Sequence, residues 1–177
     1  MENELLENII GVCSVLSKYG VEYLIVGGTA VALHGYFRIT TDMAGKPNEK
    51  HDLDFWYNPT YGNYFNLLKA LDELGLDITE YKNESVPNPK KSFFKFETSK
   101  FTLDFLPELK SLKKFIAAFN SKEIVPISGT EIWFISYEDL ITEKLESGRP
   151  KDIADIDQLN LIRDEESEED TSLKDSE

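Results

Sequence analysis

Apolar positions recur along the chain at two spacings, which predict a series of helices and strands. Helical spacing predicts helices over 4–18, 29–34, 58–74, 109–120, 136–147 and 151–162. Short apolar or alternating runs predict strands over 22–26, 52–57, 77–81, 92–98, 100–106, 123–127 and 130–134. Residues 36–50 are polar and rich in turn-forming residues, which predicts a loop. We therefore expect an α/β (α+β) fold, with a mixed central β-sheet covered by helices and further helices at the C-terminal end.

The composition favours one folded domain followed by an acidic tail. With 177 residues, of which 41% are hydrophobic, residues 1–163 have room for a core. Residues 164–177 hold eight acidic residues and one lysine, so they carry −7 of the net charge of −14. They contain one leucine and no aromatic residue, which predicts a disordered tail.

The sequence also bears on location and on partners. No apolar run approaches the roughly 18 residues that span a bilayer, and the first eight residues lack the basic start of a signal peptide. The single cysteine, Cys13, cannot form an internal disulfide, and we expect it to be a buried packing residue on a helix. Together these features predict a cytoplasmic protein with no membrane partner. The strong acidity argues against a dedicated binder of duplex DNA. The lysines and phenylalanines between Lys82 and Lys100 are compatible with an ordinary strand bearing solvated lysines, or with a patch that faces a substrate.

Three aspartates on two predicted strands are the strongest candidates for chemistry. A strand alternates faces, so Asp52 and Asp54 point to one side while Leu53 and Phe55 point to the other. Neighbouring carboxylates repel each other unless a cation lies between them. Asp104, on a second apolar strand, adds a third oxygen ligand of the kind that Mg²⁺ prefers. The alternative is an exposed strand face, but the apolar neighbours favour a strand inside the sheet.

A glycine pair lies between the first predicted strand and the next helix. Gly27 and Gly28, followed by Thr29, would let a phosphate approach the backbone N–H groups of a helix start. A tight turn without a ligand explains the same residues, and the sequences GxxxxGK[ST] and GxGxxG are absent. Two histidines and one cysteine make no zinc set, and no G-x-S-x-G elbow is present. We interpret His34 as a helix-end residue.

In order and combination, these motifs resemble a known family. Residues 23–31, then His34-Gly35, Arg38 and Asp52-Leu53-Asp54, resemble the start of a nucleotidyltransferase domain of the DNA polymerase beta-like superfamily. The similarity is to its minimal bacterial members, including the abortive-infection toxin type. Residues 139–141, Lys144 and 149–156 resemble these proteins again, so the resemblance covers roughly residues 20–160.

The resemblance implies an enzyme that transfers a nucleoside monophosphate from a triphosphate, with ATP among the candidates, to a hydroxyl group. Implied acceptors are a small molecule, an RNA 3′ end or a protein, and an antitoxin-like protein partner is implied as well. The implied site residues are Asp52, Asp54 and Asp104 as catalytic ligands of two Mg²⁺ ions, and Gly27, Gly28, Thr29, Lys144, Arg38 and Arg149 as nucleotide-binding residues. Asp152 would support the site from the last helix. Without the aspartates, the charged residues from Lys144 onward would read as a solvated helix.

One departure from the family pattern leaves other functions open. In typical members an Arg-x-Thr segment runs almost straight into the acidic pair, whereas here residues 42–50 intervene. We interpret them as a loop inserted beside the active site, which puts the roles of Arg38 and Thr40 in question. A catalytically inactive nucleotide-binding or regulatory, antitoxin-like protein is therefore one alternative. An interaction domain whose acidic tail docks a basic partner is another.

Overall fold

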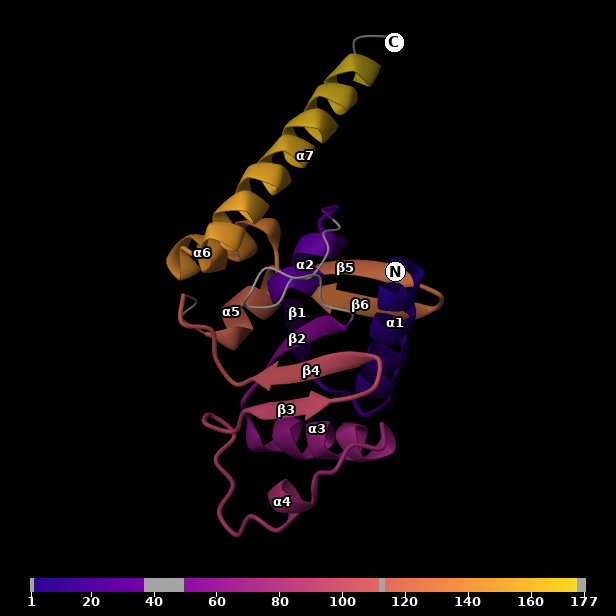
Figure 1. Ribbon diagram of the computed structural model, residues 1–177, viewed down its shortest axis with the longest axis vertical. Coiled ribbons are helices and arrows are strands. Elements are labelled where there is room, and N and C mark those ends of the chain that lie inside the picture. Colours follow the sequence, from indigo (N-terminus) through magenta and orange to yellow (C-terminus); the bar gives the residue numbers. More distant parts are fainter. Residues whose placement is uncertain (1, 37–49, 112–113, 175–177) are drawn as a thin grey trace.

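A six-stranded mixed sheet with helices packed against it forms the body of the protein (Figure 1). The computed structural model describes residues 2–36, 50–111 and 114–174. The elements are α1 (Glu2–Lys18), β1 (Tyr23–Val26), α2 (Gly27–Leu33), β2 (His51–Tyr57), α3 (Tyr61–Glu73), α4 (Thr79–Lys82), β3 (Phe94–Glu97), β4 (Phe101–Leu106), α5 (Phe115–Asn120), β5 (Glu123–Ile127), β6 (Thr130–Phe134), α6 (Tyr137–Ser147) and α7 (Pro150–Lys174). The expected α+β fold with a mixed, helix-covered sheet is confirmed.

The strand order β3-β4-β2-β1-β6-β5 places β2 near the middle of the sheet. There β2 runs antiparallel to β1 and parallel to β4, and β3 pairs antiparallel with β4. At the other end, β6 runs parallel to β1 and forms a hairpin with β5. Two segments about fifty residues apart in the chain, β2 and β4, thus become neighbours in the sheet.

One face of the sheet is packed into the core by α1 and α3. Phe55 of β2 stacks on Phe105 of β4, with ring centroids 4.9 Å apart, and Tyr64 of α3 packs against Phe94 of β3 at 5.7 Å. Cys13 of α1 is fully buried, as predicted, and burial raises the pKa of its thiol to about 12. These residues fix which side of β2 and β4 is apolar, so the polar residues between them point to the opposite face.

Two predicted elements between the strands differ in the structure. The strand predicted over 77–81 is wrong, because the chain forms the short helix α4, and the Asp77 carboxylate accepts a hydrogen bond from the backbone N–H of Thr79 at 3.0 Å. The helix predicted over 109–120 begins only at Phe115. Leu109 is buried without being helical, so its apolar character reflects packing alone. Of the predicted loop, residues 37–49, including Arg38, Thr40 and most of the insertion, lie outside the described residues.

The last helix is longer than the sequence pattern predicts. Instead of ending near Ile162 before a disordered tail, α7 continues to Lys174 and extends away from the body of the molecule (Figure 1). No glycine or proline interrupts residues 151–174, and glutamate has good helix propensity, so nothing local stops the helix. Within the described residues, no helix combines the length and apolar character that crossing a membrane requires.

Candidate active site

The register between β2 and β4 brings the predicted aspartates onto one face of the sheet. Asp54 pairs with Asp104, and Asp52 pairs with Thr102. Paired residues of neighbouring parallel strands point to the same side, so all three carboxylates share the face opposite the Phe55–Phe105 stack. The Thr102 hydroxyl donates a hydrogen bond to the Asp52 carboxylate. Two acidic side chains, Asp54 and Asp104, thus lie next to each other across a strand pair.

The electrostatics of this face indicate uncompensated negative charge. The pKa of Asp54 is raised to about 7, first because the carboxyl is desolvated and then because Asp104 and Asp52 repel its charge. Lys95 of β3 offsets part of this charge, since its ammonium lies 3.3 Å from Asp104 Oδ2. The other oxygen, Asp104 Oδ1, is buried without a hydrogen-bond partner among the described residues. A cation that approached this face would therefore be stabilised.

The types of side chain on this face suit a divalent metal, although their described positions do not form a complete set of ligands. Among residues 2–36, 50–111 and 114–174, no group of three or more His, Cys, Asp and Glu side chains is close enough to hold an ion as placed. The donors are nevertheless all oxygens, which Mg²⁺ prefers, and Asp104 Oδ1 has no other described partner. Asp54 and Asp104 are the residues that would hold the ion, with Asp52 on the same face two residues away.

Gly27 lies directly against the Asp54 carboxylate. Its backbone has φ +63°, in the left-handed region, and a Cβ at this position would lie 2.3 Å from Asp54 Oδ2. Only glycine fits here without displacing the carboxylate. Gly28 follows in the first turn of α2, so the predicted glycine pair and the predicted acidic pair meet in space.

Thr29 makes a hydrogen bond to the neighbouring strand. Its hydroxyl donates to the backbone carbonyl of Asp52 at 2.8 Å, and the residue is buried. This bond ties α2 to β2 and so helps to hold Gly27 against Asp54. The resemblance implies that Thr29 holds the triphosphate; the structure shows its hydroxyl bound to the β2 backbone.

Lys144 is buried in an ion network between α6 and α7. Its side chain is 2% exposed, and its ammonium lies 3.0 Å from Asp152 Oδ1 and 2.8 Å from Asp155 Oδ2. Ser147 and Arg149 donate to Asp152 as well. Burial by itself raises the pKa of Asp152, but the hydrogen bonds from Arg149, Ser147 and Lys144 outweigh burial and hold this pKa well below its ordinary value. The network joins α6 to the start of α7, and in it the Lys144 ammonium is directed at carboxylates of its own chain.

The corner between α6 and α7 faces the aspartates through other charged residues. Arg149 is more than half exposed, donates to Asp152 from Nε at 2.6 Å, and lies close enough to Asp54 for their charges to interact. Lys151 lowers the pKa of Asp54 and Glu143 raises it, although both effects are smaller than that of burial. Asp152 therefore fixes the Arg149 side chain through this ion pair, and the supporting role of Asp152 stays a prediction of the resemblance.

Sequence reasoning missed Lys95, Glu143 and Lys151 as neighbours of the aspartates. Lys95 was recoverable in principle, since a hairpin turning near Ser99 pairs position 95 with position 104, and this pairing is observed. The pattern alone gives no means of finding Glu143 and Lys151, because they approach Asp54 only through the packing of α6 and α7. Arg38 lies outside the described residues.

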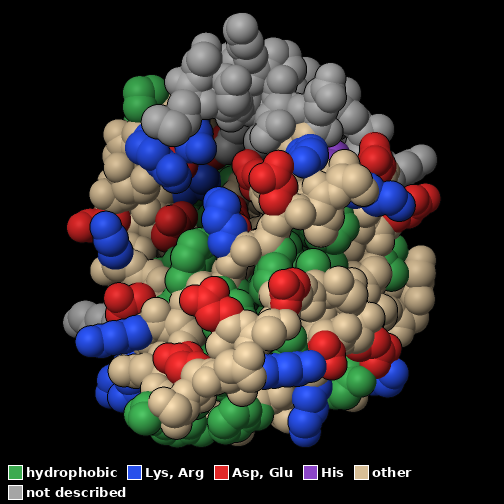
Figure 2. Space-filling model, turned by 60° about the horizontal axis from the view of Figure 1, so that its bottom comes forward, with side chains coloured by type: hydrophobic (Ala, Val, Ile, Leu, Met, Phe, Trp, Pro, Cys, Tyr) green, Lys and Arg blue, Asp and Glu red, His purple; other side chains and the backbone are tan. Residues whose placement is uncertain are grey.

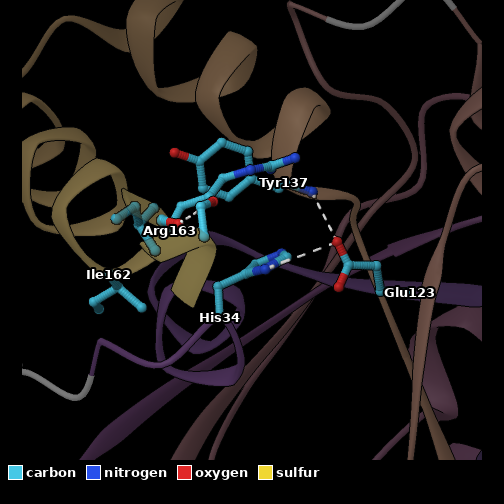
Figure 3. A pocket seen from close by; sticks show the side chains of 7 residues that line it. His34, Glu123, Tyr137, Ile162 and Arg163 are labelled. Carbon is cyan, nitrogen blue, oxygen red and sulfur yellow. Dashed lines mark hydrogen bonds and ion pairs between the residues drawn. The ribbon is translucent and has the colours of Figure 1, made fainter. Parts of the chain in front are cut away.

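His34 lines a cavity whose lining residues do not include the three aspartates. It forms the C-cap of α2, as the helix-end interpretation predicts, and its Nε2 donates to the Ile135 carbonyl at 2.9 Å. Its Nδ1 lies 3.9 Å from the Glu123 carboxylate, in a cavity of about 360 Å³ that Tyr137 and Arg163 also line (Figure 3). These contacts attach the end of α2 to the segment that joins β6 to α6.

Comparison with known proteins agrees with the fold. Residues 95–169 match the model of a family described as "Nucleotidyltransferase of unknown function (DUF6036)". None of the curated proteins compared with the chain is significantly similar to it. The matched segment includes Asp104, Lys144 and the whole ion network, whereas Gly27, Asp52 and Asp54 precede it.

Three solved structures share the fold at low sequence identity. A candidate nucleotidyltransferase from Thermotoga maritima has a TM-score of 0.54 and 16% identity, covering 94% of each chain. The antibiotic-resistance factor ANT(2″)-Ia has a TM-score of 0.54 and 15% identity, covering 99% of this chain and 98% of its own. An antigenic nucleotidyltransferase-like protein from Paracoccidioides brasiliensis has a TM-score of 0.50 and 15% identity, covering 90% and 75%. The expected resemblance is therefore confirmed: the protein has a nucleotidyltransferase-like fold, and its C-terminal half matches a nucleotidyltransferase family.

Proposed function

We propose that this protein transfers a nucleoside monophosphate from a nucleoside triphosphate to a hydroxyl group, with release of pyrophosphate and with divalent cations at the aspartates. The observation that carries the proposal is the in-register pair of Asp54 and Asp104, with Gly27 in contact with Asp54. An acidic pair beside a half-buried glycine pair at the start of a helix is suited to phosphate held through metal ions. The fold and the matched family support the same reaction class.

Different residues contribute to different parts of this reaction. The acceptor oxygen forms a bond to the α-phosphorus, while the bond from that phosphorus to the pyrophosphate oxygen breaks. In this proposal Asp104 receives the proton of the acceptor hydroxyl, and the Lys95 ammonium lies 3.3 Å from Asp104 Oδ2. Mg²⁺, when bound at the carboxylates, would stabilise the charge that develops on the attacking and leaving oxygens.

The positive charges near Asp54 are suited to the triphosphate. Arg149 directly precedes α7, Lys151 lies in its first turn, and both interact electrostatically with Asp54. A bound triphosphate would bring several negative charges to this corner, and these cations would offset them. In this proposal Lys144 acts by holding α6 and α7 together, and Gly27 and Gly28 allow the phosphates to approach the backbone.

The proposal is tested by following the α-phosphate of labelled triphosphates. The full chain is incubated with each of the four α-labelled nucleoside triphosphates, Mg²⁺ and a cell extract as the source of acceptor. We expect label to appear on an acceptor, and we expect Asp54→Asn and Asp104→Asn each to reduce the transfer at least about a hundredfold, because each removes a metal ligand. Asp157→Asn, which makes the same chemical change at an exposed position of α7, should retain the activity.

Binding distinguishes the inactive alternative. If calorimetry detects binding of Mg²⁺ with a non-hydrolysable triphosphate but no label is transferred, the chain is a nucleotide-binding protein without catalysis. If neither binding nor transfer occurs, the proposed function is wrong. The toxin-like subtype and an antitoxin-like partner stay predictions of the resemblance, and a cytoplasmic location stays a prediction from the sequence.

A further inference from the structure

A cavity of about 430 Å³ lies just beyond the aspartates, at the C-terminal ends of β2 and β4. Its apolar walls come from the end of β2, the segment after β4 and the first turn of α5, and its polar rim comes from loops on both sides. The lining residues are Trp56, Asn58, Pro59, Thr60, Lys90, Pro107, Glu108, Leu109, Lys114, Phe115 and Ile116. The proposed reaction, as described above, uses none of these residues.

The cavity lies on the same face of the sheet as the carboxylates. Trp56 follows Asp54 by two residues on β2, and its register partner Leu106 follows Asp104 by two on β4. Two residues span roughly 7 Å along a strand. The Trp56 indole N–H donates to the Pro107 carbonyl at 3.3 Å, and the Phe115 ring meets the indole edge to face. These contacts fix the Trp56 wall of the cavity relative to Asp54 and Asp104. The separation along the strand is short enough for one small molecule to reach both the cavity and the carboxylates.

Gly27 and the segment that lines the cavity after β4 approach β2 from opposite sides. Gly27 follows β1, which pairs with one side of β2, and it lies against Asp54, whereas the cavity residues 107–109 follow β4, which pairs with the other side of β2. In an in-line displacement, the attacking and leaving oxygens lie on opposite sides of the phosphorus. If the pyrophosphate lies at Gly27 and Gly28, the acceptor approaches from the side of the cavity.

The lining residues also indicate the chemistry of the occupant. Phe115, Pro107 and Ile116 offer apolar surface, while the lysines at positions 90 and 114 carry exposed ammonium groups at the rim against one acid, Glu108. This balance is positive in a chain of net charge −14. Figure 2 shows basic side chains between the acidic ones on one face of the molecule, so the acidity is not uniform over the surface. An occupant with an apolar ring and a negative group matches the cavity, and a polycation does not.

We propose that this cavity is the acceptor subsite, and that it takes a nucleoside monophosphate unit, either as a free nucleotide or as the 3′-terminal nucleotide of an RNA strand. The ribose hydroxyl faces Asp104, the base lies against Pro107, Phe115 and Ile116, and the phosphate pairs with Lys90 and Lys114. One such unit supplies a ribose hydroxyl for the reaction, a planar base for the apolar wall and a phosphate for the two lysines. The inference rests on the proposed transferase function, because it names that reaction's acceptor.

Fluorescence of Trp56 tests the proposal without turnover or metal. The chain has two tryptophans, so Trp133→Phe leaves Trp56 as the sole indole. This variant is titrated with adenosine monophosphate in EDTA, and we expect a saturable change in emission. Lys90→Glu combined with Lys114→Glu should weaken binding at least tenfold. Lys69→Glu combined with Lys100→Glu makes the same change of net charge at exposed lysines outside the cavity and should bind normally. Equilibrium dialysis of labelled adenosine monophosphate with the unsubstituted chain provides a second measurement that does not depend on the Trp133 variant.

Each outcome decides for or against the acceptor subsite. Binding that survives an excess of a non-hydrolysable ATP analogue with Mg²⁺ supports a separate subsite, and displacement by that analogue overturns it. Absence of binding, equal loss in the control pair, or preference for spermine over the nucleotide also overturns it. Tighter binding of a triadenylate with a free 3′ hydroxyl identifies the RNA end as the source, and equal or weaker binding identifies the free nucleotide. Because this titration needs no triphosphate, its failure leaves the α-phosphate transfer assay untouched.

Discussion

Replacement of Lys144 by methionine tests whether this residue holds the fold or contacts the nucleotide. The ammonium lies within 3.0 Å of Asp152 and 2.8 Å of Asp155, and all three side chains are almost inaccessible to solvent. At an effective dielectric constant near 20, each contact contributes about 6 kcal/mol of attraction, which offsets the cost of burying the charges. Without the lysine, both carboxylates stay buried but lose that attraction.

We expect Lys144→Met to lower the free energy of unfolding by about 3–5 kcal/mol, the usual cost of removing one partner of a buried ion pair. A domain of this size is stable by about 5–15 kcal/mol, so the variant should fold but unfold at a much lower urea concentration. Combining Lys144→Met with Asp155→Leu should recover part of the loss, because an apolar pair leaves no buried charge at that contact.

Urea unfolding followed by circular dichroism measures these differences, with Lys151→Met as the control. Lys151 is exposed on the neighbouring helix α7, so its replacement should change stability by less than about 0.5 kcal/mol. The structural role of Lys144 is refuted if Lys144→Met unfolds within 1 kcal/mol of the unsubstituted chain. Loss of triphosphate binding without loss of stability would restore the role that the sequence predicts for Lys144.

Two further predictions concern Gly27 and Asp152. Gly27→Ala places a methyl group 2.3 Å from Asp54 Oδ2 on a backbone with φ +63°, so we expect at least a hundredfold loss of nucleotide transfer and a loss of about 1–3 kcal/mol in stability. Gly11→Ala in α1, where nothing lies within 4 Å of the new methyl group, should keep activity and gain up to about 1 kcal/mol; equal activity of the two variants would contradict the role of Gly27. The pKa of Asp152 is lower in the folded than in the unfolded chain, so its stabilising contribution is present above the unfolded pKa of about 3.9 and is lost as pH falls below it. Between pH 5 and 2, the unfolding free energy should therefore fall more steeply for the unsubstituted chain than for Asp152→Asn, by up to about 1.4 kcal/mol per pH unit. Urea titrations at each pH measure this difference. Parallel pH profiles of the two proteins would show that Asp152 does not titrate in this way.

Much of the local structure could be predicted from the sequence because it depends on periodicity. The alternation in 52–57 identifies which side chains of β2 share a face, and Asp52 and Asp54 do so. The glycine pair after the first apolar strand predicts a turn, and Gly27 adopts positive φ there. The wrong strand at 77–81 and the late start of α5 come from short apolar runs, for which periodicity does not separate strand, helix and buried loop.

The chain pattern by itself determined the mixed α+β class, the candidate acidic residues and their common face on β2. Only the tertiary structure decided that β4 lies parallel to β2 with Asp104 beside Asp54, since a strand's pattern gives its faces but not its neighbour. Packing also decided that Lys144 is buried between two aspartates, because a lysine on a polar helix looks the same in sequence whether it faces solvent or a buried carboxylate. The cavity at Trp56, built from four separate segments, exists only once those segments have packed together.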